Sequence, residues 1–366
     1  MSDFDLRLQE LLGSDLVSTM PSDVLSKVLH NLCSKGPLRL RFVLFVSKRL
    51  YLAAINDASL WTTISFDAEF ISHFAGRSVK QANSFIAQCL LYSDSLPLRL
   101  SIQDLDQFDG DRLLGHLRSF RNSKYRGFTR CSSLVWSYSP TASFRKIADL
   151  FPKEFPSLQS ISLSGFDDQE DGSRFPDCPA LVKMEILDHL EPYPSFWGTN
   201  FAHVTTLSFG NSHTSRWRDF DFTTLSLFPM LHNLTLFTVN KTRKLDGFDS
   251  QRPIQFKNLQ ILRAHGDIPS EIFTELVAPS LEELHIKGDA KNFTPVAAIL
   301  YSPGLLCSHL YALLPEAVAM NEPEWATDLS RLVQACAKLE TLHIPKWMEV
   351  ECRTFLNGSN IILHVV

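Results

Sequence analysis

The chain has 366 residues, of which 45% are hydrophobic and 20% are charged, and its formal net charge at pH 7 is −5. This is the composition of an ordinary globular protein longer than one average domain, which excludes long disordered stretches. The mildly acidic balance argues against nucleic acids and anionic membrane surfaces as partners, because both require a basic patch.

The sequence favours a location in the cytoplasm, the nucleus or both. No apolar run is long enough to span a membrane, and the acidic start MSDFDLRLQELL lacks the features of a signal peptide. The seven cysteines form no C-x-x-C pair, and their odd number fits reduced, mostly buried thiols.

Residues 1–17 form an N-terminal segment, and residues 18–64 are expected to form three short helices. After Pro21, apolar residues at positions 24, 25, 28 and 29 lie on one broad helix face, which Gly36-Pro37 ends. A second apolar run follows from Leu38, and the segment closes on Leu60-Trp61. So small a unit buries too little of its chain to be stable alone. We therefore expect it to dock onto the following residues and onto a partner protein.

The order of residues in this segment resembles the F-box. The matching residues are Met20-Pro21, Asp23-Val24-Leu25, Val28-Leu29, Val46-Ser47-Lys48-Arg49 and Leu60-Trp61. The resemblance implies docking onto the Skp-type adaptor of an SCF-type cullin–RING ubiquitin ligase through a hydrophobic helix interface. It implies that the adaptor-binding residues are Met20, Pro21, Val24, Leu25, Val28, Leu29, Val43, Val46, Lys48, Arg49 and Trp61. Arg39, where the family usually has an acidic residue, is the departure that alters the polar rim of such an interface.

Residues 65–130 are expected to join the helical segment to the rest of the chain as irregular coils and helices. The pattern predicts one amphipathic helix over residues 79–90, a strand at PLRLSI and a second helix around residues 113–120.

Residues 131–366 carry a repeated pattern, Leu-x-x-Leu-x-Leu, at intervals of roughly 25 residues. The first apolar residues of the clear copies are Leu158, Leu181, Val204, Leu231, Leu259, Leu281 and Leu339. Weaker copies are placed at Leu134 and Leu305, and the tail NIILHVV is expected to be a final strand. This period and strand signature resemble the leucine-rich repeat, in which each unit adds one strand to a curved parallel sheet. The whole chain is thus similar to F-box proteins with divergent leucine-rich repeats of the fungal type, an α/β fold.

The connectors between repeats are expected to differ from one another. Residues 143–151, 269–277, 294–300 and 324–337 read as helices. The asparagine that usually ends the motif is missing, and Trp347 stands at one of its positions. Backbone groups at these turns must therefore find other hydrogen-bond partners.

The residues between the motif leucines are expected to face the concave side of the arc, the usual binding surface of such folds. Early repeats present small hydroxyl residues there, whereas late repeats present cationic and imidazole side chains. This pattern suggests a site for an acidic or phosphorylated segment of a target, with the alternative that it is a solvated sheet face. The candidate target-binding residues are Phe237, Arg263, His265, His285, Lys287 and His343.

No nucleophile, phosphate-binding or metal-binding motif occurs in the sequence, so we expect neither an enzyme nor a cofactor or metal. The expected function is that of a substrate-recognition subunit, which binds a Skp-type adaptor, through it a cullin, and a target protein. The alternative is a leucine-rich-repeat scaffold or binding module, outside any ligase, whose helical segment only caps the repeats. A hydrolase with residues on the repeat loops is the remaining, least favoured possibility.

Overall fold

The computed structural model describes residues 19–33, 36–40, 47–74, 79–103, 110–121, 127–137, 151–164, 176–187, 201–210, 225, 227–237, 254–266, 276–288, 307–316 and 324–366. The chain divides into two compact units, the first Met1–Ile161 with Phe175–Ala180 and the second Ser162–Arg174 with Leu181–Val366. Within the described residues, no helix has the length and apolar character needed to cross a membrane.

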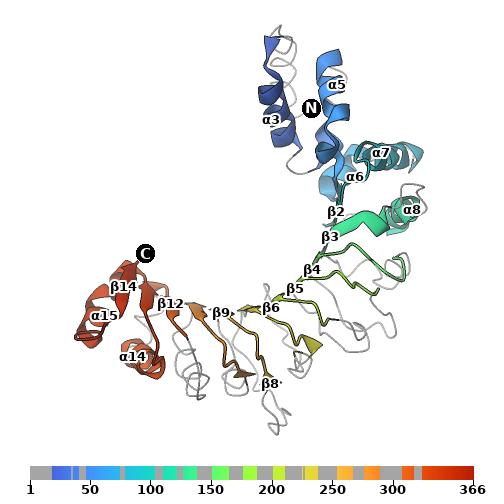
Figure 1. Ribbon diagram of the computed structural model, residues 1–366. Helices are drawn as coiled ribbons and strands as arrows, with labels where there is room; N and C mark the ends of the chain where they lie inside the picture. Colours follow the sequence, from blue (N-terminus) through green and yellow to red (C-terminus); the bar gives the residue numbers. More distant parts are fainter. Residues whose placement is uncertain are drawn as a thin grey trace. The chain divides into compact units, whose positions relative to one another are not determined.

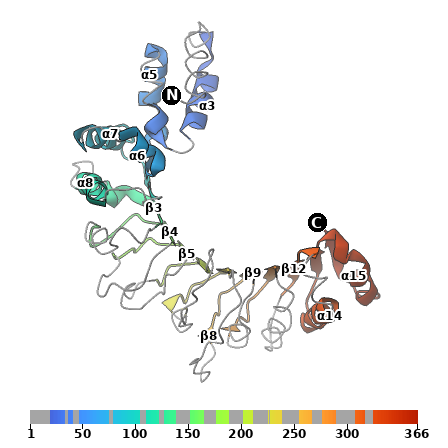
Figure 2. The ribbon, with the colours of Figure 1, turned by 180° about the vertical axis from the view of Figure 1, so that it is seen from behind.

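The first unit begins with two α-helices that lie side by side, α3 (Ser22–Leu32) and α5 (Lys48–Asn56) (Figures 1 and 2). Pro21 precedes α3, as expected, and the short helix η1 (Pro37–Arg39) follows Gly36. The Ser47 side chain caps α5 by accepting the Leu50 N–H at 3.1 Å. Apolar residues of both helices form a shared core, and η2 (Ala58–Trp61) closes the segment. The buried residues are Leu25, Leu29, Leu32, Leu50, Ala54, Leu60 and Trp61.

The rest of the first unit consists of parallel strands with helices between them. Strands β1 (Thr63–Phe66), β2 (Leu98–Ile102) and β3 (Cys131–Ser137) pair in that order. The helices are α6 (Ala68–Phe74), α7 (Val79–Tyr92) and α8 (Gly110–Arg121), followed by η4 (Phe128–Arg130). The helices expected near residues 79–90 and 113–120 and the strand at PLRLSI are therefore confirmed, whereas β1 and α6 were not predicted.

One sheet of twelve strands runs through the chain in the order β1-β2-β3-β4-β5-β6-β7-β9-β11-β12-β13-β14. The later strands are β4 (Ser160–Ser164), β5 (Lys183–Leu187), β6 (Thr206–Gly210), β7 (Asn233–Phe237), β9 (Ile261–Gly266), β11 (Glu283–Gly288), β12 (His309–Leu313), β13 (Thr341–Ile344) and β14 (Ile362–Val365). Strands β8 (Ile254–Gln255) and β10 (Leu276–Val277) form a separate parallel pair. Each strand of the large sheet neighbours the next one along the chain, apart from β8 and β10, so each coil adds one strand, as in a solenoid.

All seven clear copies of the leucine pattern form strands of this sheet, and the expected final strand forms as β14. In the coils of the seven clear copies the apolar residues of the pattern are buried, for example Leu281, Leu284 and Ile286. Most residues between them are partly exposed, so these strands alternate in burial, whereas Thr235 on β7 is buried. Full burial stabilises each such aliphatic side chain by about 1.5–3 kcal/mol, so the repeated pattern also supplies the core.

Three coils use an apolar residue other than leucine, valine or isoleucine at the first position of the pattern. Leu310 pairs with Leu284, so Cys307 occupies the first position, two residues after the predicted Leu305. Similarly, the Gln159 N–H donates to the Ser132 carbonyl, which aligns Cys131 with Leu158 and corrects the position predicted at Leu134. In the first coil, buried Trp61 precedes Ile64 and Phe66 in the same spacing. Cysteine and tryptophan fill these positions because they are apolar when buried.

The connectors confirm some of the sequence predictions and correct others. Helix α14 (Trp325–Ala335) confirms the helix predicted over 324–337, and η7 (Lys346–Met348) and α15 (Glu349–Phe355) follow β13. The prediction over 269–277 is wrong at its end, because Leu276–Val277 is the strand β10. The helix predicted over 294–300, and all of the helix predicted over 143–151 except its last residue, lie outside the described residues. Within the second unit, Figure 1 shows α14 below the strands β12 and β14 in this view and beside α15.

Trp347 provides the hydrogen bond for a backbone carbonyl at one of the turns that lack the usual asparagine. Its indole N–H donates to the carbonyl of Leu314, which directly follows β12, at 3.1 Å. A side chain of one coil thus satisfies a backbone acceptor of the coil before it.

Candidate interaction surfaces

The residues that the F-box resemblance assigns to adaptor binding divide between the core and the surface of the first unit. Leu25, Leu29 and Trp61 are buried, and the Trp61 indole N–H donates to the Ala54 carbonyl at 2.7 Å. These three build the core of the helical segment and are not accessible to a partner in this structure. Pro21, Val24 and Lys48 are exposed, and Met20, Val28 and Arg49 are partly exposed. Val43 and Val46 lie outside the described residues.

Two polar contacts hold α3 against α5. The Arg49 guanidinium donates to the carbonyl of Met20, just before α3. At the other end of the pair, the His30 ring nitrogen Nε2 lies 3.0 Å from a carboxylate oxygen of Asp57, which follows α5. Arg49 and Met20 were both assigned to adaptor binding, and in this structure they also fix the helix pair.

Helix α5 carries two exposed apolar residues that sequence reasoning missed. Tyr51 is 38% exposed and Leu52 is 43% exposed, similar to Val24 at 39% on α3. The F-box resemblance points to the preceding residues, Val46-Ser47-Lys48-Arg49, and not to these two. The signal that would have found them is the helix cap at Ser47, which sets which residues of α5 face outward.

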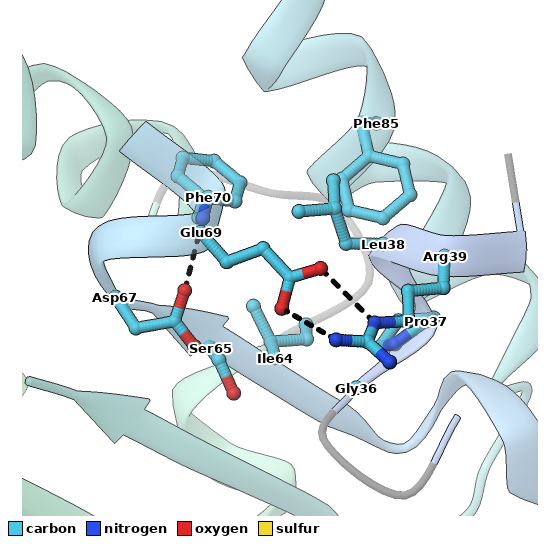
Figure 3. Close-up of a pocket in the computed structure, with 10 residues that line it drawn as sticks. All are labelled: Gly36, Pro37, Leu38, Arg39, Ile64, Ser65, Asp67, Glu69, Phe70 and Phe85. Carbon is cyan, nitrogen blue, oxygen red and sulfur yellow. Dashed lines mark hydrogen bonds and ion pairs between the residues drawn. The ribbon is translucent and has the colours of Figure 1, made fainter. Parts of the chain in front are cut away.

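Arg39 does not project freely into the solvent. Its guanidinium donates to both carboxylate oxygens of Glu69 on α6, at 3.0 and 3.4 Å, and Figure 3 shows the two groups facing each other beside Pro37 and Ile64. Asp67 caps the start of α6 by accepting the Phe70 N–H at 2.9 Å. This ion pair therefore ties the helical segment to the first coil, in addition to any effect on a polar rim.

The second candidate surface lies on the last strands of the second unit, where the strand register aligns side chains in rows. One row contains Arg263, His285, Tyr311, His343 and His364, from β9 to β14. The adjacent row contains Phe237, His265 and Lys287. The structure thus brings together all six predicted target-binding residues. We call Arg263, His265, His285, Lys287, Tyr311, His343 and His364 the late patch.

Four rings of the first row stack into a continuous ladder, which we call the ring ladder: His285, Tyr311, His343 and His364. The centroid separations are 3.9, 4.2 and 4.5 Å and the interplanar angles are 3°, 11° and 9°. Tyr311 and His364 were missed in the sequence. Both were missed because the exposed positions were taken only from the seven clear copies of the pattern, and neither the coil of Cys307 nor the final strand is one of these.

Burial and neighbouring positive charges lower the pKa of three histidines of the late patch, His265, His285 and His343. Burial first, and then the charges of Lys287 and Arg263 and the neighbouring His285, lower the pKa of His265. Burial also lowers the pKa of His285, against the opposing effect of Glu283, whose carboxylate accepts its N–H at 3.1 Å. The pKa of His343 is lowered by burial and by three further histidines, His364, His309 and His285.

Phe237 is partly exposed and packs edge-on against His265, with ring centroids 5.0 Å apart. Gly210 on the neighbouring strand has φ +157°, and a Cβ there would meet the Phe237 carbonyl at 2.0 Å. Glycine at this position leaves room for the backbone and the Cβ of Phe237 on the neighbouring strand.

Within the described residues, no group of histidine, cysteine and acidic side chains is arranged to hold a metal ion. All seven cysteines are free, and all except Cys33 are buried, as expected. The two surfaces are suited to binding. The first unit presents exposed apolar side chains, and the second unit presents cationic side chains beside stacked rings.

No protein-family model and no curated protein matches the chain. Among solved structures, one match is the leucine-rich repeat-containing protein LegL7 from Legionella pneumophila, with 14% identity over 85% of this chain and 87% of that chain and a TM-score of 0.32. At this TM-score the likeness carries no argument. The description of the chain as a solenoid of leucine-rich-repeat type rests on its strand order and on the burial of its repeated pattern.

Proposed function

We propose that this chain is the substrate-recognition subunit of an SCF-type ubiquitin ligase, in which the helices α3 and α5 bind a Skp-type adaptor and the repeats bind a target protein. The observation that carries the proposal is the division of the F-box positions. Leu25, Leu29 and Trp61 are buried in the first unit, while apolar Pro21 and Val24 remain on the surface.

The apolar surface of the two helices supports a protein partner over a purely structural cap. Val24 on α3 and Leu52 and Tyr51 on α5 are each more than a third exposed. Apolar side chains on two neighbouring helices are the kind of surface that docks against helices of a partner. The polar contacts that hold α3 to α5 preorganise this surface and so reduce the entropy lost on binding.

In this function the chain does no bond chemistry and needs no cofactor. It holds a target lysine near a ubiquitin-conjugating enzyme that a cullin delivers through the adaptor, which makes transfer nearly intramolecular. Such a mechanism benefits from a firm joint between the adaptor-binding helices and the first coil. The ion pair of Arg39 with Glu69 and the burial of Trp61 in the first coil provide this joint. The site of action would be the cytoplasm or the nucleus.

The experiment that tests the proposal is co-purification of the full chain with the Skp-type adaptor and cullin from the cytoplasmic and nuclear fractions. We expect the wild-type chain to retain both, and Val24→Glu with Leu52→Glu to lose both. The matched control is Val182→Glu with Met230→Glu, because these apolar residues are each 45% exposed but lie outside the helical segment. Retention of adaptor by the first variant, or absence of adaptor from the wild type, would instead favour a repeat scaffold with a helical cap.

A further inference from the structure

Between its two ends, the ring ladder exposes ring edges rather than ring faces. Its three contacts are face to face, so neighbouring rings cover each other's faces. Only the outer faces of the two end rings, His285 and His364, are not covered by another ring of the ladder. The donor groups left for solvent are the C–H and N–H groups of the ring edges and the tyrosine O–H, whose hydrogens carry partial positive charge. Such edges suit an anion or a hydrogen-bond acceptor, whereas stacking with a nucleobase needs a free ring face.

The charged side chains around the ring ladder also favour an anionic ligand. Arg263 precedes the ladder in its row, and Lys287 follows His285 on β11. Neither cation forms an ion pair with another residue that the structure describes, whereas Glu283 already accepts a hydrogen bond from His285. Asp267 and Asp289, which follow β9 and β11 in the sequence, lie outside the described residues. Arginine and lysine side chains of this kind form strong, charge-assisted hydrogen bonds with phosphate and carboxylate oxygens.

The row sets the length of a matching ligand. It crosses five neighbouring strands from Arg263 to His364, hence four gaps of about 4.8 Å, or about 19 Å in all. An extended chain advances about 3.4 Å per residue, so about six residues cover the row.

We propose that the late patch binds an extended acidic segment of a target protein, with an anionic group held by Arg263 and Lys287 and acceptor groups along the edges of the ring ladder. Phosphorylated residues and aspartate or glutamate both supply this chemistry. The inference rests on the proposed function only in taking the ligand to be part of a target protein.

The test measures binding of labelled peptides to the full chain by fluorescence anisotropy. The probes are a peptide of alternating phosphoserine and glycine, the same peptide with aspartate in place of phosphoserine, and the same peptide with unmodified serine. A short oligothymidylate serves as the nucleic-acid probe. We expect the acidic peptides to bind and the serine peptide not to bind. Tighter binding of the phosphoserine peptide identifies phosphate as the preferred group, and equal binding identifies any anionic side chain.

The decisive variant is Arg263→Glu with Lys287→Glu, which we expect to weaken the acidic peptides by at least about tenfold. Its matched control is Lys183→Glu with Lys257→Glu, which makes the same change in net charge at exposed residues of the same unit. The control should bind as the wild type does.

Three results would overturn the inference. They are no binding of either acidic peptide up to about 1 mM, an equal loss of affinity in the control variant, and tighter binding of the oligothymidylate than of both peptides. Adaptor retention is measured on the same preparations. A chain that retains the adaptor but binds no acidic peptide refutes this inference alone, whereas loss of adaptor in the wild type refutes the proposed function.

Discussion

Replacing Tyr311 tests whether the ring ladder stabilises the last coils of the second unit. Tyr311 stacks on His285 at 3.9 Å and on His343 at 4.2 Å, so Tyr311→Ala removes two ring contacts. Each such contact is worth about 0.5–1.5 kcal/mol beyond area burial, which gives a loss of about 1–3 kcal/mol in the free energy of unfolding. In a unit of this size the melting temperature should fall by about 2–12 °C.

The assay is thermal and urea unfolding of the full chain, followed by circular dichroism, with Tyr311→Phe as the matched variant. Phenylalanine keeps the ring and removes only the hydroxyl, so its unfolding free energy should stay within about 0.5 kcal/mol of the wild type. Two results would refute the reasoning: an alanine variant as stable as the wild type, or a phenylalanine variant destabilised as much as the alanine variant. The second would assign the stabilisation to the hydroxyl instead of to stacking.

Three further predictions concern charge and hydrogen bonding. The pKa values of three late-patch histidines lie below the ordinary 6.5, so the ligand-free chain should lose stability as the pH falls below about 6.5, because the unfolded state then binds more protons. A bound anion favours protonation, so affinity for the acidic peptides should rise over the same fall in pH; affinity independent of pH in titrations between pH 7.5 and 5.5 contradicts this. A double-mutant cycle of Arg39→Ala and Glu69→Ala, measured by urea unfolding, should give a coupling of about 0.2–1 kcal/mol, since both side chains are partly exposed; zero coupling would remove the ion pair as a joint. Trp347→Phe should lower the free energy of unfolding by about 1–3 kcal/mol in the same assay, because the carbonyl of the buried Leu314 loses its hydrogen bond. An unchanged free energy of unfolding would show that the indole hydrogen bond does not contribute to stability.

The parts of the fold that were predictable from the sequence are those in which the buried residue is a long aliphatic one. The coils that begin with Leu158, Leu259 or Leu339 were found by their spacing alone, because leucine recurring at this interval is typical of few folds besides a solenoid. The coils that begin with Cys131 and Cys307 were misplaced, because cysteine fills a buried position without standing out in the pattern.

The candidate sites were harder to predict than the fold because they depend on register and on distant pairs. The exposed positions were taken only from the seven clear copies of the pattern, so Tyr311 and His364, which lie on other strands, were left out and the ring ladder was not predicted. The pairing of Arg39 with Glu69 joins residues far apart in the sequence and follows from packing that no local pattern records. Burial of Trp61 likewise depends on its place in the first coil.

The most direct test of the central claim is calorimetric titration of the purified Skp-type adaptor onto the full chain. The account predicts one adaptor per chain and a negative heat-capacity change, the mark of apolar burial. Val24→Glu with Leu52→Glu should weaken binding by at least about 100-fold, while Val182→Glu with Met230→Glu should bind as tightly as the wild type. No binding of the adaptor to the wild-type chain, or equal binding to the first variant, would contradict the assignment of the helices α3 and α5 to adaptor docking.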